Sequence, residues 1–536
     1  MKRPVANILT IFLLTAATII FEISLSRLFS YLLSFHFVLI IIAFSILGLG
    51  IGQISYAKFY KRMDNTLVFW AAMPAVSMFL SFFLLLVLSK IGISSYTDFA
   101  LPVFIILSMV PFIAIGIVYA FIFEANKRYV STLYAIDLIG AAGGALASVF
   151  LLNSFSLVYV VAIAIGLLLL VWAIRALASK NRYSRAFALL SLAIIFLLGI
   201  GKDALDVDIP VSKDPSKDMY RLMGNPTLQS ETLESRWSAF GKTDLVRFTY
   251  PDSTVSKTMF IDGAAGTEMV NIDELAKDSI KMRKTLSGFP AVFAMNFVKE
   301  NDKDSVLIIG PGGGIDIAAA YFSGYRYIDA VEVNPSFVQL MEKYNPATFL
   351  DKENIKVQVN EGRNFVIKNK GKYDAILLTI PVTKGSRGTD FYGLTENYLF
   401  TMEALADYLE GLTENGTIYF TMHAKQEVYK MLANYLELQD RIGIGQKEAL
   451  KKIYIFSNGM NPVLVIKKTP FEQKMIEEVH RIAHYLELDQ DVFYFPYIKQ
   501  EGLDTILRNV NYQWFMFDNL IYNISSGNFP HNELWK

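Results

Sequence analysis

Hydrophobic residues fill the first 200 positions in long blocks. There are seven such blocks: Ile8–Leu33, Phe35–Ala57, Leu67–Leu88, Ala100–Phe123, Leu133–Leu152, Leu157–Leu177 and Ala186–Gly201. Most of them reach the roughly 20 residues that a helix needs to cross the hydrocarbon core of a bilayer. The pattern therefore predicts an α-helical polytopic membrane domain over residues 1–201, in which the seventh block is the shortest.

The second part of the chain shows short apolar runs separated by polar turns. Residues 202–217 carry interleaved Asp and Pro residues that predict a linker, and residues 218–290 favour the strands of a small β-rich unit. Five runs of strand length then alternate with amphipathic segments: Ser305–Ile309, Ile328–Val333, Ile355–Val359, Tyr373–Thr379 and Gly416–Met422. This alternation predicts a Rossmann-like α/β domain over residues 291–425, which an α/β part over residues 426–536 completes.

Charged residues are concentrated in the second part of the chain. Only 18 of the 100 Asp, Glu, Lys and Arg residues fall within positions 1–201, which supports a division into a membrane part and a soluble part. The net charge is zero, so nothing in the composition indicates a nucleic-acid partner. The absence of cysteine excludes disulfides, thiolate metal sites and a cysteine nucleophile.

Three charged residues interrupt the apolar blocks. Glu22, Arg27 and Asp137 would be costly in hydrocarbon, so they are expected to point into the helical bundle. They either neutralise one another or form a polar site for a lipid-borne or amphiphilic substrate, and both alternatives stay open. The fifth block also carries a stripe of small residues that predicts a close helix-packing face: Gly140, Gly144 and Ser148.

A glycine-rich turn follows the first strand of the α/β part. Ser305–Ile309 runs into a Gly-Pro-Gly-Gly-Gly turn over residues 310–314, and a helix is predicted to begin at Ile315. Glycines allow the backbone to approach a ligand closely, and the helix N-terminus behind them offers unpaired N–H groups. Glu332 ends the next strand, where a carboxylate can accept hydrogen bonds from a ribose. This unit therefore predicts a nucleoside ligand.

The turn departs from two other nucleotide motifs. The dinucleotide fingerprint requires a third glycine where this chain has Ile315, and a phosphate-binding loop requires a Gly-Lys-Ser/Thr run that the turn lacks. A broad glycine turn with a strand-end Glu suits the methionine and ribose ends of S-adenosylmethionine or a relative. No metal is expected at this site.

Further polar residues follow the next strands at the same predicted edge. Glu361 and Gly362 follow the third strand, where the carboxylate can meet an adenine amino group or lie beside a helix N-terminus. Thr379 ends the fourth strand, and the segment after it, rich in Gly, Ser and Thr, predicts a loop over the site. Asp262 is a candidate acid, although Asp before Gly is more often a turn residue.

Several of these runs together resemble the spermidine synthase (polyamine aminopropyltransferase) family. The runs are SVLIIGPGGGIDIAAA, AVEVNP, VNEGRNF, YDAILLT and the stretch from Leu399 to Gly416. More narrowly, the chain is similar to membrane-anchored bacterial relatives, in which a multi-span bundle precedes a Rossmann-like methyltransferase fold. The resemblance covers most of Tyr220–His423 and, more loosely, Asp137–Gly144.

The resemblance implies that S-adenosylmethionine or its decarboxylated form is the co-substrate. The glycine turn would hold the methionine end, Glu332 would bind the ribose hydroxyls, and Glu361 would meet the adenine. The full set of residues expected to bind it is Gly310, Gly312, Gly313, Gly314, Asp316, Glu332, Asn334, Glu361, Gly362 and Thr379.

The chain departs from the family where the family binds its acceptor. The Asp-x-Ser/Thr-Asp run after the fourth strand is replaced by Thr-Ile-Pro-Val over residues 379–382, and an Asp-Gly-x-x-Gln run loses its Gln at Gly266. A polyamine needs spaced carboxylates and a base, so ordinary spermidine synthesis is in doubt. Replacement catalytic residues are expected among Asp262, Asp390, Tyr392 and Glu396.

The expected function is the transfer of a methyl or aminopropyl group to an unknown acceptor, which is amphiphilic or delivered by the membrane. One alternative is a polyamine aminopropyltransferase with relocated acids. Another is a non-catalytic nucleoside sensor or a transporter. The expected partners are the lipid bilayer and the acceptor, with no nucleic acid, and a homodimer stays open.

Lysine and arginine residues gather in alternate loops of the apolar half. One set of loops holds Lys2, Arg3, Lys58, Lys61, Arg62, Lys127, Arg128, Arg175, Lys180, Arg182 and Arg185, and the other set holds Lys90. Because such an excess marks the cytoplasm, the N-terminus is expected on the cytoplasmic side of a bacterial inner membrane. Seven crossings would then place the second half outside. We nevertheless expect a cytoplasmic soluble domain, with Ala186–Gly201 in the interface or another block not crossing, unless the ligand is not a cytosolic nucleoside.

Overall fold

A computed structural model describes residues 3–33, 35–60, 71–91, 99–177, 182–201, 203–215, 217–345, 352–380, 398–459, 461–490 and 492–498. The chain forms two compact units. The first holds Met1–Val255 with Phe260–Gly266, and the second holds Ser256–Met259 with most residues from Thr267 onward. The division between these units falls near residues 255–267, and the predicted linker at residues 202–217 lies within the first unit.

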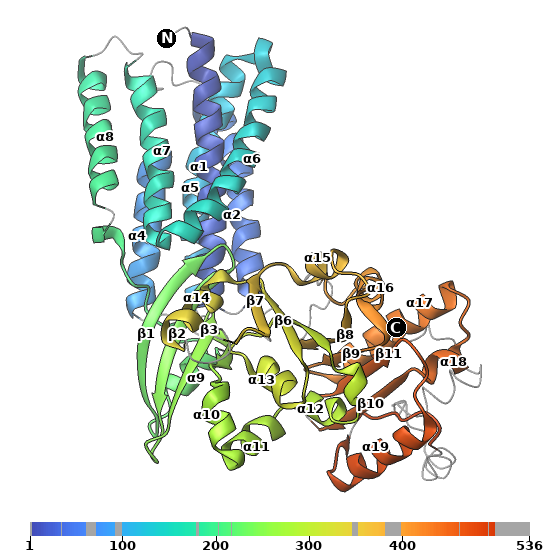
Figure 1. Ribbon diagram of the computed structural model, residues 1–536. Coiled ribbons are helices and arrows are strands. Elements are labelled where there is room, and N and C mark those ends of the chain that lie inside the picture. The colour runs from blue at the N-terminus through green and yellow to red at the C-terminus, as the bar shows by residue number, and fades with distance from the viewer. Residues whose placement is uncertain are drawn as a thin grey trace. The chain divides into compact units, whose positions relative to one another are not determined.

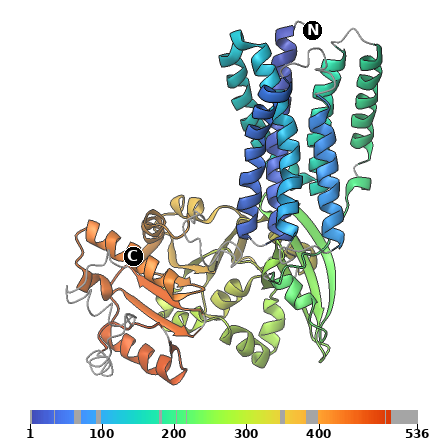
Figure 2. The same cartoon turned by 180° about the vertical axis from the view of Figure 1, so that it is seen from behind.

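The first unit begins with seven long apolar helices. They are α1 (Arg3–Leu32), α2 (Phe35–Ser55), α4 (Met73–Ile91), α5 (Ala100–Ala125), α6 (Val130–Ser154), α7 (Leu157–Leu177) and α8 (Arg182–Ile200). Among the described residues, these seven are long and apolar enough to cross a membrane, including α8. Figure 1 and Figure 2 show from two sides that the helices run alongside one another as a bundle.

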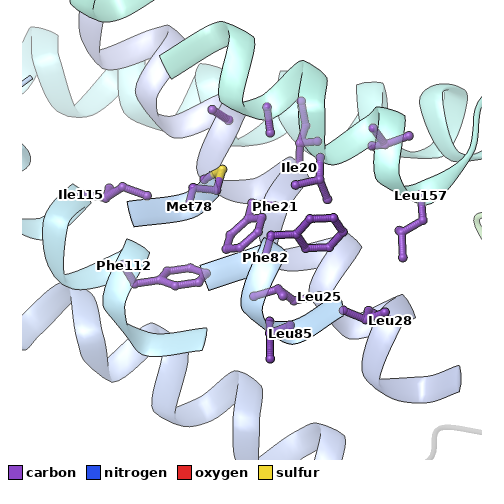
Figure 3. Close-up of a cluster of buried hydrophobic side chains, with 14 of the residues drawn as sticks. Ile20, Phe21, Leu25, Leu28, Met78, Phe82, Leu85, Phe112, Ile115 and Leu157 are labelled. Carbon is purple, nitrogen blue, oxygen red and sulfur yellow. The ribbon is translucent and has the colours of Figure 1, made fainter. Parts of the chain in front are cut away.

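Apolar side chains from several helices fill the interior of the bundle. Phe21 of α1 and Phe112 of α5 have ring centroids 6.0 Å apart, and Phe82 of α4 lies beside Phe21 in Figure 3. Gly140 and Gly144 of α6 face α1, because a Cβ at either position would come within 2.8 Å of an α1 carbonyl oxygen. The small-residue packing face predicted for the fifth block is therefore confirmed.

The carboxyl end of α1 is joined to a β hairpin of the same unit. β1 (Gln229–Ser238) and β2 (Gly241–Thr249) pair antiparallel, and the side chain of Lys242 in β2 is only 2% exposed. Its Nζ donates to the Tyr31 hydroxyl of α1 at 3.1 Å and lies 2.9 Å from Asp244 Oδ1. These partners are needed because a buried ammonium group without them would strongly destabilise the fold.

The segment before the hairpin also packs on the end of α1. The Ser212 hydroxyl donates to the Leu32 carbonyl at 2.8 Å, and Lys217 Nζ donates to the Ser30 carbonyl at 2.6 Å. Ser212 and Lys217 are both buried, and α9 (Asp218–Met223) follows them. Some of the residues predicted as a linker thus pack within the first unit.

The second unit is built on a mixed sheet of eight described strands. They are β5 (Ser305–Ile309), β6 (Tyr327–Glu332), β7 (Ile355–Val359), β8 (Tyr373–Thr379), β9 (Leu412–Thr421), β10 (Ile453–Asn458), β11 (Val463–Lys467) and β12 (Asp489–Gln490). Their order is β12-β10-β11-β9-β8-β5-β6-β7, preceded along the chain by a sheet of order β1-β2-β3-β4 with β3 (Val255–Ile261) and β4 (Ala264–Glu268). The predicted α/β domain is confirmed, and its five predicted strands lie within a few residues of β5 to β9.

Helices connect the strands of this sheet. They are α10 (Ile272–Lys277), α11 (Ser279–Ser287), α12 (Ala291–Met295), α13 (Ile315–Phe322), α14 (Pro335–Tyr344), α15 (Gly362–Ile367), α16 (Met402–Gly411), α17 (Lys425–Arg441), α18 (Gln446–Leu450) and α19 (Gln473–Tyr485). β5 pairs parallel with β6 and β8, β6 with β7, and β8 with β9. Because parallel strands end at the same edge of a sheet, the residues after β5, β6, β7, β8 and β9 are brought to one edge.

The two ends of α1 contact different parts of the first unit. Near its start, Asn7 Nδ2 donates to Asn126 Oδ1 at 2.6 Å, and Thr10 Oγ1 accepts from Arg175 Nε at 3.0 Å. The basic loops after α5 and α7 therefore lie at the end of the bundle away from the hairpin. If the seven helices cross a membrane, the excess of basic residues assigns the hairpin to the non-cytoplasmic side. The cytoplasmic location of the soluble domain stays a prediction.

Labelling of single cysteines decides between the two orientations. Because the chain has no cysteine, Glu231→Cys in β1 and Arg128→Cys in the loop after α5 each introduce the sole thiol. Both positions are exposed. We expect a membrane-impermeant maleimide to label Glu231→Cys on intact cells and Arg128→Cys only after lysis. The reverse pattern would establish the cytoplasmic location, and the wild-type chain is the unlabelled control.

Candidate functional site

The glycine turn after β5 requires glycine for its backbone shape. Gly310, Gly312 and Gly314 have φ angles of 75°, 51° and 96°, in the left-handed region that residues with a Cβ rarely adopt. Gly314 immediately precedes α13, so the turn ends at a helix N-terminus. This is the strand, glycine turn and helix that the sequence predicted.

The turn is held by the chain itself. A Cβ on Gly313 would lie 1.9 Å from the carbonyl oxygen of Glu268, closer than any side chain tolerates. Gly313 N–H donates to Thr267 Oγ1 at 2.9 Å, and Val270 N–H donates to the Gly313 carbonyl at 2.9 Å. The sequence attributed these glycines to the approach of a ligand. At Gly313, the neighbouring backbone already accounts for the requirement.

Glu332 connects the turn to the end of β6. Its Oε2 accepts from Gly312 N–H at 3.3 Å and its Oε1 accepts from Asn334 N–H at 2.9 Å. The residue is 6% exposed, and this burial raises the pKa of its carboxyl, while the backbone N–H groups oppose the rise. The carboxylate is therefore fixed beside the glycine turn, where the sequence predicted a ribose ligand.

The residues after β6 and β7 serve as helix caps. Asn334 accepts from Ser336 N–H at 3.0 Å at the start of α14. Glu361 accepts from the N–H groups of Arg363 and Asn364 at 3.0 and 2.7 Å at the start of α15. The sequence allowed two roles for Glu361, and the structure shows the one at a helix N-terminus, where the residue is itself the cap. Its contact with adenine stays a prediction.

Gly362 has a packing role at the same edge. A Cβ on Gly362 would lie 2.4 Å from Cγ2 of Ile309, the last residue of β5. Since α15 begins at Gly362, this close approach seats its first turn directly against β5. Its prediction as a cofactor-binding residue remains untested.

Asp316 is a buried carboxyl group in the first turn of α13. It is 3% exposed, and burial raises its pKa from 3.8 to about 7. The nearby Thr379 hydroxyl, at the end of β8, opposes this rise. Even so, neither Asp316 Oδ1 nor Thr379 Oγ1 has a hydrogen bond of normal geometry among the described residues. The structure thus brings together two residues that the sequence placed at one edge.

The predicted catalytic residues are only partly described. Asp390, Tyr392 and Glu396 lie outside the described residues. Asp262 belongs to the first unit, where its carboxylate accepts from Ser30 Oγ at 2.7 Å and from Lys242 N–H at 2.9 Å. These contacts give Asp262 a structural role between α1 and β2. Catalysis by any of the four residues stays a prediction.

Two threonines at the site were not predicted. Thr267 accepts from Gly313 N–H, and Thr421 ends β9 beside Thr379, its partner in the parallel pairing of β8 and β9. Nothing in the sequence singles out Thr267, because its contact depends on how the chain returns to the glycine turn. Thr421 could have been found, since it lies one residue before the end of the fifth predicted strand, and Thr379 ends the fourth. Within the described ranges, no cluster of three His, Asp or Glu side chains could hold a metal ion.

Comparison with known proteins gives a consistent result. No family model matches the chain. The chain is 22% identical over 464 residues to polyamine aminopropyltransferase 1 of Streptomyces coelicolor, which covers 82% of this chain and 81% of that protein. It is 29% identical over 131 residues to the polyamine aminopropyltransferase of Clostridium botulinum. This match covers 23% of this chain and 43% of that protein.

A solved structure belongs to the same group. The spermidine synthase of Thermotoga maritima matches with a TM-score of 0.32 and 17% identity, covering 57% of this chain and 87% of that one. The Streptomyces match is longer than the entire chain after Gly201, so the similarity includes part of the helical bundle. The predicted resemblance to polyamine aminopropyltransferases is thus confirmed.

A side chain at position 313 is expected to destabilise the second unit. Gly313→Ala would bring Cβ against the Glu268 carbonyl, and such overpacking typically costs about 1–3 kcal/mol. The measurement is the apparent melting temperature of the full-length protein in detergent. Gly445→Ala is the matched control, because nothing lies within 4 Å of its Cβ. Equal stability of the two variants would contradict the close approach.

Stability is expected to depend on pH through Asp316. The pKa of Asp316 is about 7 in the folded protein, whereas its ordinary value, which applies to the unfolded chain, is 3.8. The free energy of unfolding therefore falls as the pH rises from about 4 to about 7, and it stays lowered above that pH. Asp316→Asn cannot ionise, so above pH 7 it should exceed wild type by up to about 4 kcal/mol. Asp440→Asn, at an exposed position of α17, should follow wild type in melting curves across this range.

Proposed function

We propose that this chain is a membrane-anchored transferase that binds S-adenosylmethionine or its decarboxylated form at the edge formed by the glycine turn, Glu332 and Asp316. The observation that carries the proposal is the Glu332 carboxylate, which Gly312 N–H and Asn334 N–H hold at the end of β6. An ionised carboxylate has about four acceptor positions, so it can bind a ribose hydroxyl in addition to these donors.

The chemistry follows from the sulfonium group of the co-substrate. A nucleophile on the acceptor attacks a carbon bonded to the sulfonium sulfur, the carbon–sulfur bond breaks, and its electron pair neutralises the sulfur. The protein contributes mainly by holding the two reactants in line, because the leaving group is already activated. Methyl transfer requires only that the protein hold the two reactants in line. Aminopropyl transfer has the same requirement, with the attack at a different carbon.

The acceptor is amphiphilic or reaches the site from the membrane. The seven long apolar helices support this part of the proposal, and so does a similarity to a curated aminopropyltransferase that extends into them. A second candidate is a non-catalytic nucleoside sensor. It is favoured by the end of β8, where Thr379 takes the place of the first carboxylate of the related enzymes, and by the engagement of Asp262 within the first unit.

Calorimetric binding by the full-length protein tests the proposal. The entire chain is needed because β2 buries Lys242 against Tyr31 of α1, so deleting the helices would expose that charge. We expect S-adenosylmethionine or its decarboxylated form to bind, and Glu332→Gln to weaken binding at least tenfold. Glu342→Gln, exposed on α14, should bind like wild type.

Each outcome of this measurement has a direct reading. Binding followed by release of a thioether nucleoside on addition of membrane lipids or amines supports the transferase. Binding without turnover for any acceptor supports the sensor. If no nucleoside binds, or if Glu332→Gln binds like wild type, the proposed site is wrong.

A further inference from the structure

The helical bundle of the first unit holds a guanidinium group that lacks an acidic partner. Arg175 belongs to the last turn of α7, and α7 packs against both α1 and α8 (Figure 1). Its Nε donates to Thr10 Oγ1 of α1 at 3.0 Å. Its Nη2 is enclosed by the protein and has no hydrogen-bond acceptor among the described residues, and Arg175 forms no ion pair with them.

A second unpaired donor lies one turn earlier on the same helix. Trp172 precedes Arg175 by three positions, so the two side chains share a face of α7. The indole ring stacks on Phe187 of α8 with ring centroids 5.7 Å apart, and its Nε1 has no acceptor within the described part of the chain. Roughly 90% or more of buried polar groups in native structures are hydrogen-bonded, so two neighbouring unpaired donors point to an absent acceptor.

Two acids of the bundle do not supply this acceptor. Asp137 Oδ1 accepts from Thr15 Oγ1 at 2.6 Å and from the Tyr119 hydroxyl at 3.0 Å. Glu22 lies twelve positions beyond Thr10 on α1, which is about 18 Å along the helix axis. The guanidinium group beside Thr10 is therefore out of reach of Glu22, and the oxygen of Asp137 that faces Thr15 already has its donors.

Arg27, near the other end of α1, has a counter-ion within the chain. Its Nη1 donates to the Phe240 carbonyl at 3.3 Å, and the Asp262 carboxylate lies close enough for the two charges to interact. The Nε of Arg27 is also unpaired among the described residues, but its charge is balanced. Arg175 has no such balance, and an enclosed charge without a partner is strongly destabilising. A negatively charged ligand would remove this deficit.

The position of Arg175 indicates which anion is within reach. It lies at the end of the bundle that carries the basic loops, which the excess of Lys and Arg assigns to the cytoplasm. The ends of membrane helices lie at the level of the lipid headgroups, where Trp side chains are enriched as well. A guanidinium group matches a phosphate in shape and in sign, and basic pockets between helices on the cytoplasmic side bind anionic headgroups.

We propose that Arg175 and Trp172 bind the phosphate group of an anionic phospholipid at the basic end of α7. We call these two residues the headgroup site. Arg175 Nη2 and Trp172 Nε1 donate to oxygens of the phosphate, while Arg175 Nε stays on Thr10. The proposal rests on the membrane anchoring in the proposed function. It does not depend on the nucleoside, because all residues of the headgroup site belong to the helical bundle.

Lipid selectivity of the wild-type chain is the first test. Native mass spectrometry of the full-length protein in detergent measures the binding of phosphatidylglycerol and of phosphatidylcholine with the same acyl chains. We expect a preference of about tenfold or more for phosphatidylglycerol, because the choline cation opposes binding beside an unbalanced guanidinium group. Inorganic phosphate should not displace the lipid. Equal binding of the two lipids overturns the proposal, and displacement by inorganic phosphate shows a free-anion site in place of a lipid site.

The same measurement on three variants is the second test. Arg175→Gln removes the charge and should abolish the preference for phosphatidylglycerol. Trp172→Phe keeps a ring beside Phe187 but removes the N–H group, so it should weaken binding by a smaller factor. Arg185→Gln, at an exposed position in the first turn of α8, is the matched control and should keep the preference of wild type. An equal loss in Arg185→Gln would show that diffuse basic charge attracts the lipid, and the headgroup site would be wrong.

Failure of the headgroup site differs from failure of the proposed function. If no nucleoside binds while Arg175→Gln alone loses the lipid preference, the proposed co-substrate is wrong and the headgroup site stands. If nucleosides bind and Arg175→Gln keeps the lipid preference, the headgroup site is wrong and the co-substrate stands. The comparison of lipids on the wild-type chain needs no variant, so it decides the question even where a substitution impairs folding.

Discussion

The carbonyl oxygen of Glu268 lies where any side chain at position 313 would have to begin. This contact fixes the glycine turn against the Thr267–Val270 segment, and the turn in turn fixes the start of α13. The position of the Asp316 carboxyl and the N–H group that Gly312 offers to Glu332 both follow from it. The candidate site is thus organised first by backbone packing within the second unit, and a ligand would bind to an edge that is already formed.

Burial has the same effect on both acids of this edge. The pKa values of Glu332 and Asp316 are raised because each carboxyl has lost its contact with water. They differ in what compensates for that loss. Backbone N–H groups surround Glu332 and favour its charged form, whereas Oδ1 of Asp316 has no hydrogen-bond donor within the described part of the chain. Glu332 therefore has more support for its charged form from the chain itself than Asp316 has.

Much of the architecture was predictable because it depends on patterns that are local in the sequence. The alternation of short apolar runs with amphipathic segments gave β5 to β9, and the small residues of the fifth block gave the packing of α6 on α1. Glu361 was predicted at the right edge, but its two roles could not be separated until its distances to Arg363 N–H and Asn364 N–H were known. The contacts of Thr267 and Lys242 were not predictable, because each joins residues that no sequence periodicity relates.

The joint between Lys242 and Tyr31 bears on the order in which the protein is made. The two residues are 211 positions apart, so at ordinary synthesis rates α1 leaves the ribosome roughly 10–40 seconds before its partner strand. During that interval the residues that pair with Tyr31 and with the Ser30 carbonyl, Lys242 and Lys217, have not yet been translated. If α1 forms as it is made, the hairpin of β1 and β2 folds onto a helix already in place, and α1 acts as a template for these two strands.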